Sequence, residues 1–483
     1  MTVADDRARA YAGRRVLVAG TGVAGTACAE VLLGLGAQVT VLDRTESEAF
    51  VRLREEGARA VLGDEPDRAL LAEVDDVIVS PGFAPHSPLA RAALAAGKPV
   101  YSEPELAWRL RGPEAAGWLA VTGTNGKTTT TTMLAAILRA AGYRTAALGN
   151  IGEPLVHAVL RDDYEVLAVE LSSFQLYWSA TLAPQGGALL NLADDHLEWH
   201  GDFESYATAK TAIWRAAVTG SGVAVGNLDD PLVAARLHAR PFAHDPAAAD
   251  PSARVGGGRT VGVTLGVPKP GELGVMDGAL VDRAFGPADG VELASVAQIR
   301  PAGAHNVSNA LHAAALARSW GVPESAVRSA LAGYEPQPHR NALVATVGGV
   351  AYVDDSKATN PHAALASLTA YPRVVWIAGG QLKGVDVSDL VATVADRLVG
   401  AVLLGVDRAQ VAEALRRHAP AVPVVEVGRT DDEAMTEVVR AAAGLARPGD
   451  TVLLAPAAAS KDMFTGYDQR GERFAAAVSA LAG

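Results

Sequence analysis

The stretch Val121-Thr-Gly-Thr-Asn-Gly-Lys-Thr-Thr129 decides the fold of the middle of the chain, because it stands between two opposite patterns. Residues 118–122 form a short apolar run that predicts a buried strand, and residues 127–141 have the periodicity of a helix. Glycines in such a loop let backbone N–H groups turn inward, and the helix N-terminus adds its dipole. The sequence therefore predicts a phosphate-binding loop.

The side chains of this loop suit a nucleoside triphosphate with magnesium. Lys127 is placed to neutralise the β- and γ-phosphates, and the Thr128 hydroxyl to bind Mg²⁺. The spacing departs from a strict Walker A loop, since the first glycine stands four residues before the lysine rather than six. A strand-to-helix turn without a ligand is the alternative. The candidate ATP-binding residues here are Gly123, Thr124, Asn125, Gly126, Lys127, Thr128 and Thr129.

Two further motifs follow strands and carry candidate metal ligands. Glu170 ends the predicted strand 166–170, and the run Asn191-Leu-Ala-Asp-Asp-His196 ends the strand 188–191. Carboxyl ends of strands face the ligand crevice of an open α/β sheet, so Glu170 and His196 could reach a nucleotide-bound Mg²⁺. Asp195 could orient an incoming ammonium group. The pair His196 and His200 also allows zinc, although the His-Glu-x-x-His spacing is not met.

The helix predicted over residues 206–214 contains Lys210 among small and apolar residues. For a lysine in such company, the default interpretation is a surface residue whose stem is buried and whose ammonium group reaches water.

A second glycine-rich turn, Gly20-Thr-Gly-Val-Ala-Gly25, lies near the N-terminus. It follows a predicted strand at 16–20 and precedes a predicted helix at 24–36, and Asp43 ends the next strand, 38–43. This arrangement predicts a nucleotide diphosphate near a helix N-terminus. A dehydrogenase is the rival interpretation, but it leaves the loop at 123–128 without a purpose.

The rest of the chain predicts an α/β protein of three domains. Residues 334–339 form a proline-containing linker, and residues 246–302 indicate a small antiparallel appendix. Other predicted strands are 77–80, 223–225, 374–378, 401–404, 424–427 and 451–454, with a helix over 306–320. The expected domains are Rossmann-like at 1–103, an ATPase domain with a mostly parallel sheet at 104–337, and Rossmann-like at 338–483.

Bulk composition limits the function classes. The chain has 483 residues, 49% of them hydrophobic, and a net charge of −12, which argues against a general nucleic-acid binder. A single cysteine, Cys28, rules out an internal disulfide and fits a reducing compartment. Residues 1–15 lack the apolar core of a signal peptide, and no apolar run is long enough to span a bilayer. We therefore expect a cytoplasmic protein.

Together these motifs resemble the Mur ligases, the ATP-dependent amide-forming enzymes of peptidoglycan precursor synthesis. The resemblance covers essentially the whole chain, and its loop alone would also fit a folylpolyglutamate synthetase. Among Mur ligases it is strongest to the branch that adds D-glutamate to UDP-N-acetylmuramoyl-L-alanine, and the Asp-Asn-Pro-Arg motif of the diaminopimelate- or lysine-adding branch is absent from the sequence. The more selective segments are 171–176, 338–340, 354–360 and 455–460.

The resemblance implies roles for residues of all three domains. It implies a carbamylated Lys210 as a ligand of a second Mg²⁺, and a monomer that uses ATP. It places uridine nucleotide contacts at Val23, Ala24, Asp43, Arg44, Gly82, Asn150 and His196. It places further ATP contacts at Asn306, Asn309, Arg340 and Asp355, and D-glutamate contacts at Asp195, Lys357, Thr359, Lys383, Ser460 and Tyr467. The catalytic set is Lys127, Glu170, His196, Lys210 and Arg340, and the metal ligands are Thr128, Glu170, His196 and carbamylated Lys210.

Four positions depart from the family pattern in the expected amino-acid site. Gln381 and Leu382 interrupt the usual Gly-Gly-Asp-Gly-Lys motif, Lys461 follows Ser460, and Tyr467 replaces a common phenylalanine. These departures bear on glutamate binding more than on the reaction class. A ligase for another amino acid and a non-catalytic nucleotide-binding regulator remain as alternatives.

Overall fold

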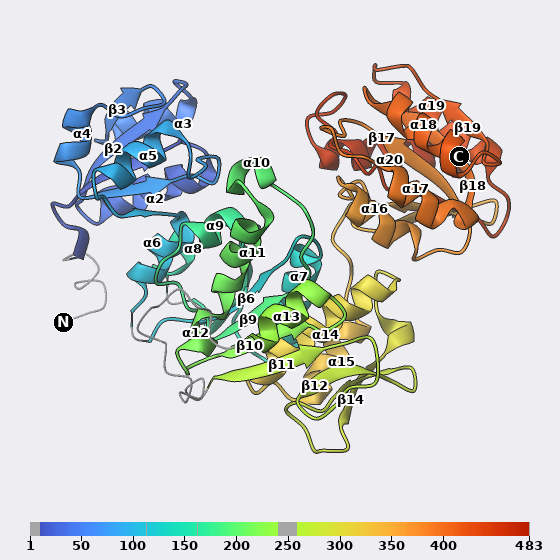
Figure 1. Cartoon of the computed structure of the whole chain (residues 1–483), viewed down its shortest axis with the longest axis horizontal. Coiled ribbons are helices and arrows are strands. Elements are labelled where there is room, and N and C mark those ends of the chain that lie inside the picture. The colour runs from blue at the N-terminus through green and yellow to red at the C-terminus, as the bar shows by residue number, and fades with distance from the viewer. Residues whose placement is uncertain (1–9, 113, 162, 240–257, 483) are drawn as a thin grey trace. The chain divides into compact units, whose positions relative to one another are not determined.

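The computed structural model describes residues 10–112, 114–161, 163–239 and 258–482. Their backbone folds into two compact units, one from residues up to 298 together with 308–332, and the other from 299–307 together with 333 onward. Three separate sheets lie within these units (Figure 1). The α/β fold of three mostly parallel sheets is therefore confirmed. The exact limits of the three domains stay a prediction.

The N-terminal sheet of the described chain is parallel and has the order β3-β2-β1-β4-β5. Val16 and Val18 of β1 pack on one face, whereas Leu17 and Ala19 pack on the other. Burial on both faces explains the continuous apolar run that predicted this strand. The strands are β1 (Arg15–Ala19), β2 (Gln38–Asp43), β3 (Arg59–Leu62), β4 (Asp76–Val79) and β5 (Val100–Tyr101). The helices are α2 (Val23–Gly34), α3 (Glu48–Glu55), α4 (Arg68–Glu73) and α5 (Pro88–Ala95).

The central sheet has the order β14-β13-β12-β11-β10-β9-β6-β8-β7 among the described residues. The strands from β7 to β12 run parallel, so the carboxyl ends of β6, β8 and β9 lie at one edge. The strands are β6 (Gly117–Thr122), β7 (Ala147–Gly149), β8 (Val166–Glu170), β9 (Gly186–Leu189), β10 (Val223–Asn227), β11 (Arg259–Val263), β12 (Glu272–Met276), β13 (Ala279–Asp282) and β14 (Val291–Ser295). The helices are α6 (Glu103–Leu110), α7 (Lys127–Ala140), α8 (Leu155–Ala158), α9 (Ser173–Tyr177), α10 (Leu197–His200), α11 (Phe203–Thr211), α12 (Arg215–Val218), α13 (Pro231–His238), α14 (Ala304–Ser319) and α15 (Glu324–Ala332), with 3₁₀ turns η1 (Ala212–Trp214) and η2 (Val296–Gln298).

The expected antiparallel appendix at 246–302 needs correction. Its first part, up to residue 257, lies outside the described residues. Strand β11 pairs in parallel with β10, and β12, β13 and β14 continue the same sheet as an antiparallel meander. The segment therefore extends the central sheet, because each of its described strands hydrogen-bonds to a neighbouring strand of that sheet.

The C-terminal sheet has the order β15-β16-β20-β17-β18-β19 among the described residues. Only the edge pair β15–β16 is antiparallel in this part of the structure. Trp376 and Ala378 pack on one face, and Val375 and Ile377 on the other. The strands are β15 (Ala342–Val347), β16 (Val350–Asp354), β17 (Val374–Gly379), β18 (Leu398–Leu404), β19 (Val424–Glu426) and β20 (Thr451–Leu454). The helices are α16 (Pro361–Leu368), α17 (Ser388–Val394), α18 (Arg408–His418), α19 (Ala434–Leu445) and α20 (Tyr467–Ala482), with the 3₁₀ turn η3 (Ala395–Arg397).

Residues 334–339 contain neither helix nor strand, as the prolines predicted. No helix in the described ranges is both long enough and apolar enough to cross a membrane.

Candidate functional site

The loop between β6 and α7 has the backbone of a phosphate cradle. Gly126 precedes α7 with a φ of 82°, and Gly123 has a φ of 159°, so both occupy conformations that favour glycine. A Cβ atom on Gly126 would approach the side-chain oxygen of Asn309 to 2.5 Å. Asn309, predicted as an ATP contact, therefore lies directly against the loop. The positive N-terminus of α7 begins at Lys127, as the sequence predicted.

Asn191 lies just past the end of β9, at the carboxyl edge of the sheet, and forms hydrogen bonds with this loop. Its Oδ1 accepts a hydrogen bond from the Asn125 N–H at 2.8 Å, and its Nδ2 donates to the Asn125 carbonyl at 3.1 Å. The Thr124 N–H also donates to the Asn191 carbonyl at 3.0 Å. The backbone of the loop is thus fixed on both sides of Asn125.

Tyr206 of α11 holds the same loop through a side chain. Its hydroxyl lies 2.8 Å from Thr124 Oγ1, which also accepts a bond from the Ala193 N–H at 3.0 Å. Sequence reasoning missed both Asn191 and Tyr206. The sequence did contain a signal for Asn191, because this residue is the first of the motif 191–196 that was chosen for Asp195 and His196. No local sequence pattern indicates a functional role for Tyr206.

Two lysines converge on the loop. Lys127 Nζ donates to the carbonyls of Gly123 and Thr124, both at 2.9 Å, and Lys210 Nζ donates to the same Gly123 carbonyl at 2.8 Å. Lys210 is only 2% exposed, so the default interpretation as a surface lysine is wrong. Its ammonium group stays inside because the Gly123 carbonyl is available to it. Burial, reinforced by the charge of Lys127, lowers the pKa of Lys210 well below its ordinary value.

Glu170 lies at the end of β8, buried at 2% exposure. Its Oε1 accepts a hydrogen bond from Asn150 Nδ2 at 2.8 Å, while Oε2 is buried with no hydrogen-bond partner in the described structure. A buried carboxylate oxygen without a donor suits a cation ligand. The structure thus brings together Asn150 and Glu170, which the sequence analysis had assigned to different ligands.

His196 directly precedes α10 and has a φ of 54°, and its side chain is 45% exposed. Its Nε2 lies 3.5 Å from Asp195 Oδ2, and burial lowers its pKa, which favours the neutral imidazole. The ring of Phe174 lies 4.7 Å from His196 and 5.7 Å from His200, measured between centroids. His200 is buried, and its Nε2 lies 3.0 Å from Ser173 Oγ.

The two histidines therefore have different surroundings, since His196 is partly exposed and His200 is buried beside Ser173. Among the described residues, no three His, Cys, Asp or Glu side chains gather as a metal cluster. Mg²⁺ commonly relies on one or two carboxylates plus substrate phosphates, and Thr128 with Glu170 fits that pattern.

The N-terminal turn is built around Asp43. Its Oδ2 accepts bonds from the Thr21 N–H at 2.6 Å and the Thr21 hydroxyl at 2.7 Å. A Cβ atom on Gly25 would come within 1.8 Å of the Gly20 carbonyl oxygen, so helix α2 packs tightly against the turn. Thr21 was not among the predicted site residues, although the glycine motif contains it.

The other predicted uridine contacts surround this turn. Val23 is 76% exposed at the start of α2, and Arg44 makes a solvent-exposed ion pair of 3.8 Å with Asp64. Ala24 is the second residue of α2, and Gly82 lies in the turn after β4.

Tryptophans of the central domain contact this same turn after β4. Trp199 Nε1 donates to the Pro81 carbonyl, and Trp178 Nε1 donates to the Phe83 carbonyl, each at 3.1 Å. Trp199 belongs to α10, and His196 is the residue just before this helix. These bonds tie the turn that carries Gly82 to the helix that follows His196.

The remaining predicted nucleotide contacts belong to the second unit. Asp355 Oδ1 accepts a bond from the Asn341 N–H at 3.1 Å, and Ser367 donates to Oδ2. Burial raises the pKa of Asp355 to about 6. His339 and Asn341, on either side of Arg340, both have positive φ, which bends the backbone sharply there. Asn306 Nδ2 lies 2.9 Å from His305 Nε2 in the same unit.

The predicted D-glutamate residues of the second unit are partly brought together. The Lys357 ammonium lies 3.9 Å from the centre of the Tyr467 ring, a cation–π contact, and Ser356 Oγ donates to the Tyr467 carbonyl at 2.6 Å. Ser460 is buried, and Lys383 has a φ of 56°. For Thr359 the structure gives a backbone bond from its N–H to the Lys357 carbonyl at 2.8 Å.

Arg470 was missed in this region. It is 1% exposed and donates to the Ser356 and Ala458 carbonyls at 2.8 and 3.1 Å, and burial lowers its pKa to about 10. Its spacing in α20 gave no signal. The departure at Leu382 is explained by packing, since its side chain is buried.

A three-sheet α/β protein with a phosphate loop at the carboxyl edge of its central sheet belongs to the class of multidomain nucleotide-binding proteins. Residues 14–102 match the Mur ligase MurD-like N-terminal domain, residues 121–246 the Mur ligase middle domain, and residues 339–458 the Mur ligase glutamate ligase domain. The chain belongs to the Mur ligase family.

Curated relatives match over nearly the full length. The chain is 54% identical to the UDP-N-acetylmuramoylalanine–D-glutamate ligase of Thermobifida fusca, covering 98% of this chain and 99% of the relative. It is 52% identical to the ligase of the same name from Streptomyces coelicolor, with the same coverage. Among solved structures, MurF from Acinetobacter baumannii aligns with a TM-score of 0.57 at 18% identity, covering 99% of this chain and 92% of that one. UDP-N-acetylmuramate-alanine ligase MurC from Thermotoga maritima aligns with a TM-score of 0.56 at 20% identity, covering 97% and 99%. These structures share the fold.

Proposed function

We propose that this chain joins D-glutamate to UDP-N-acetylmuramoyl-L-alanine at the expense of ATP, through an acyl phosphate, in peptidoglycan precursor synthesis. The observation that carries the proposal is the meeting of Lys127 and Lys210 at the Gly123 carbonyl. Two lysine side chains directed at one carbonyl of a glycine-rich loop form a site suited to an anion of high charge. A triphosphate supplies that charge, and the relatives' shared name supplies the acceptor and the amino acid.

The first step transfers the γ-phosphoryl group of ATP to the carboxylate of the muramoyl substrate. Lys127 would leave the Gly123 and Thr124 carbonyls and pair with the β- and γ-phosphates, while N–H groups of residues 123–129 bind phosphate oxygens. Asn191 and Tyr206 keep this loop in one conformation, so little reorganisation is needed during transfer. By family resemblance, Arg340 would add positive charge at the γ-phosphate, with Asp355, Asn306 and Asn309 on the nucleoside.

The residues present fit magnesium at the carboxyl edge of the central sheet. Thr128, Glu170 and His196 would hold it, because Glu170 Oε2 is buried without a donor in the described structure and His196 favours its neutral form. When bound, Mg²⁺ would neutralise charge on the transferring phosphoryl group and on the reacting carboxylate. A neutral amine is the form that reacts with CO₂, so the lowered pKa of Lys210 suits a carbamate ligand for a second ion.

In the second step the amine of D-glutamate attacks the acyl phosphate and phosphate leaves. Asp195 would orient the incoming ammonium group and accept its proton. Lys357, Thr359, Lys383, Ser460 and Tyr467 would bind the amino acid, with Lys357 already placed over the Tyr467 ring. In the first unit, Val23, Ala24, Asp43, Arg44, Gly82 and Asn150 would hold the uridine nucleotide sugar. We further propose that the enzyme works as a monomer in the cytoplasm.

A screen of phosphate release tests this function. With ATP, Mg²⁺ and UDP-N-acetylmuramoyl-L-alanine present, we expect D-glutamate to stimulate release and L-glutamate and other D- or L-amino acids to have little effect. Lys127→Ala should abolish release while circular dichroism shows an unchanged fold. Stimulation by a different amino acid would assign another ligase of the family, and ATP binding without turnover would favour a regulator.

A further inference from the structure

A cavity of about 420 Å³ lies at the opposite edge of the central sheet from the phosphate loop. Its lining includes Ala116 and Trp118 at the start of β6, and Glu165 and Leu167 at the start of β8. The phosphate loop follows the other end of β6, so about 15–20 Å of strand separates the two places. Nucleotides bind beyond the carboxyl ends of such strands, so this cavity at the amino ends is separate from the catalytic site.

Arg111 dominates the chemistry of this cavity. Its guanidinium lies 4.1 Å from the centre of the Trp108 ring and 5.5 Å from that of Trp118. Nη2 donates to the Ala116 carbonyl at 2.7 Å, but Nε is buried without an acceptor in the described structure, and no described carboxylate forms an ion pair with this arginine. Burial lowers the pKa of Arg111 to about 10. A half-buried cation without a counter-charge is costly, and an anion bound beside it would offset that cost.

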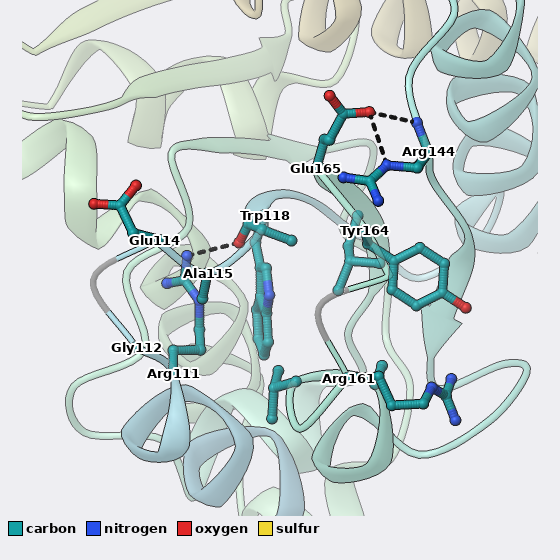
Figure 2. A pocket seen from close by; sticks show the side chains of 13 residues that line it. Arg111, Gly112, Glu114, Ala115, Trp118, Arg144, Arg161, Tyr164 and Glu165 are labelled. Atoms are coloured by element: carbon teal, nitrogen blue, oxygen red, sulfur yellow. Dashed lines mark hydrogen bonds and ion pairs between the residues drawn. The ribbon is translucent and has the colours of Figure 1, made fainter. Parts of the chain in front are cut away.

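The rest of the lining favours the same kind of ligand. Figure 2 shows the Trp118 indole between Arg111 on one side and Tyr164 and Arg161 on the other. Trp118 is fully buried, and its Nε1 has no acceptor in the described structure. The five charged residues of the lining are three arginines and two glutamates, in a chain with a net charge of −12. Arg144 and Arg161 are paired with carboxylates, so among the described lining residues Arg111 is the cation left for a ligand. The walls are aromatic, and the volume lies within the range of small-molecule sites.

We infer that this cavity binds a small molecule that carries a phosphate or carboxylate group, with Arg111 pairing with the oxyanion and Trp118 and Tyr164 lining its apolar part. Arg144 and Arg161 lie at the surface, where they pair with Glu165 and with Glu153 and Asp163. These arginines would steer anions toward the cavity more than hold them, since exposed pairs contribute little. This ligand would bind at the amino ends of the strands, whereas ATP would bind at their carboxyl ends. Binding in the cavity is therefore independent of the reaction proposed above.

Fluorine NMR of the full chain labelled with 5-fluorotryptophan tests this inference. The Trp108 signal is assigned with Trp108→Phe, and inorganic pyrophosphate and citrate are titrated as separate probes. We expect a saturable shift of the Trp108 signal that persists in Lys127→Ala, because the phosphate loop is not involved. Trp376 of the second unit serves as the internal reference and should not shift. A shift with pyrophosphate alone assigns phosphate esters, a shift with citrate alone assigns carboxylates, and a shift with both assigns a general oxyanion site.

Variants decide whether Arg111 is responsible. Arg111→Gln should weaken binding about tenfold or more, as expected for loss of a charged hydrogen bond. Arg161→Gln should weaken it only a few-fold, and Arg59→Gln, an exposed arginine of the N-terminal sheet, should leave it unchanged. Absence of any shift, or equal affinity in Arg111→Gln, would overturn the inference. If Arg111→Gln does not fold, Arg111→Lys takes its place, and because lysine lacks the forked N–H groups of a guanidinium, unchanged affinity in that variant would overturn the inference.

Discussion

The two glycine-rich turns of the first unit share one plan, a strand followed by a loop and a helix, yet they are held in opposite ways. The loop at 123–128 contains a lysine, receives a second one from α11, and is fixed by the neutral side chains of Asn191 and Tyr206. The turn at 20–25 is instead held by a carboxylate, Asp43, and helix α2 has no acidic or basic residue in its terminal turns. The first arrangement places two lysine side chains and the backbone N–H groups of the loop where a phosphoryl group would move. The turn at 20–25 instead forms a rigid surface suited to binding a substrate without taking part in its chemistry.

Lys210→Ala makes the strongest test of this contrast. Without Lys210 the phosphate loop keeps Lys127 but loses the group proposed above to carry a carbamate ligand for a second Mg²⁺. We expect the rate of D-glutamate-dependent phosphate release to fall about 10²- to 10³-fold, because one contact to the transferring charge is lost. Phosphate release should be measured at saturating substrates.

Lys210→Ala also tests whether the side chain of Lys210 acts as a carbamate or as an unmodified amine. Small carboxylic acids should partly restore the rate of Lys210→Ala if a carbamate oxygen is the missing group. Lys269→Ala, which removes an exposed lysine, should behave as the wild type. Full activity in Lys210→Ala would remove this lysine from the mechanism.

The contrast also shows how far the sequence could lead. Strands β2 and β8 begin and end at the predicted residues, because buried parallel strands read as continuous apolar runs. The β15–β16 hairpin escaped prediction because no residue of its first strand is fully buried and the strand lacks a clear alternation. Its second strand also pairs with β20, whose residues lie far away in sequence.

The residues of the candidate site also divide into those that the sequence could predict and those that it could not. The glycine conformations at Gly123 and Gly126 and the start of the helix at Lys127 could be predicted, since they follow from the local pattern of the loop. The burial of Lys210 could not, because its acceptor, the Gly123 carbonyl, lies 87 positions earlier. A lysine in a small-residue helix has the same local pattern whether it is buried or exposed. Only the fold, or a family resemblance, distinguishes the two.

Asn191→Ala tests whether a rigid loop matters as much as its charge. The change removes the side-chain hydrogen bonds to the N–H and to the carbonyl of Asn125, and it leaves both lysines in place. We expect ATP affinity to fall about tenfold, since two hydrogen bonds of ordinary strength order the loop. Titration calorimetry with ATP measures this directly. Affinity for the uridine nucleotide sugar should not change, and an equal loss for both ligands would point to general unfolding.

Asp43→Ala should have the smallest effect, and it should change KM rather than kcat. Losing the bonds to Thr21 loosens a turn that binds substrate equally in the ground and transition states, so KM for the nucleotide sugar should rise about three- to tenfold. The value of kcat should stay unchanged, as should KM for ATP. A fall in kcat instead would mean that the N-terminal turn takes part in the chemistry, and the contrast between the turns would be lost.

The pH dependence of this last effect follows from the ionisation of Asp43. Burial alone would raise its pKa, but hydrogen bonds from Thr21, Thr45 and Arg44 outweigh burial, and the pKa lies below its ordinary value. A carboxylate with a lowered pKa stabilises the folded turn above its ordinary pKa and loses that contribution as pH falls through the lowered value. The ratio of KM values between Asp43→Ala and wild type should therefore be constant from about pH 6 to 9, because Asp43 is ionised throughout. A ratio that changes within this window would show that another group, rather than this carboxylate, holds the turn.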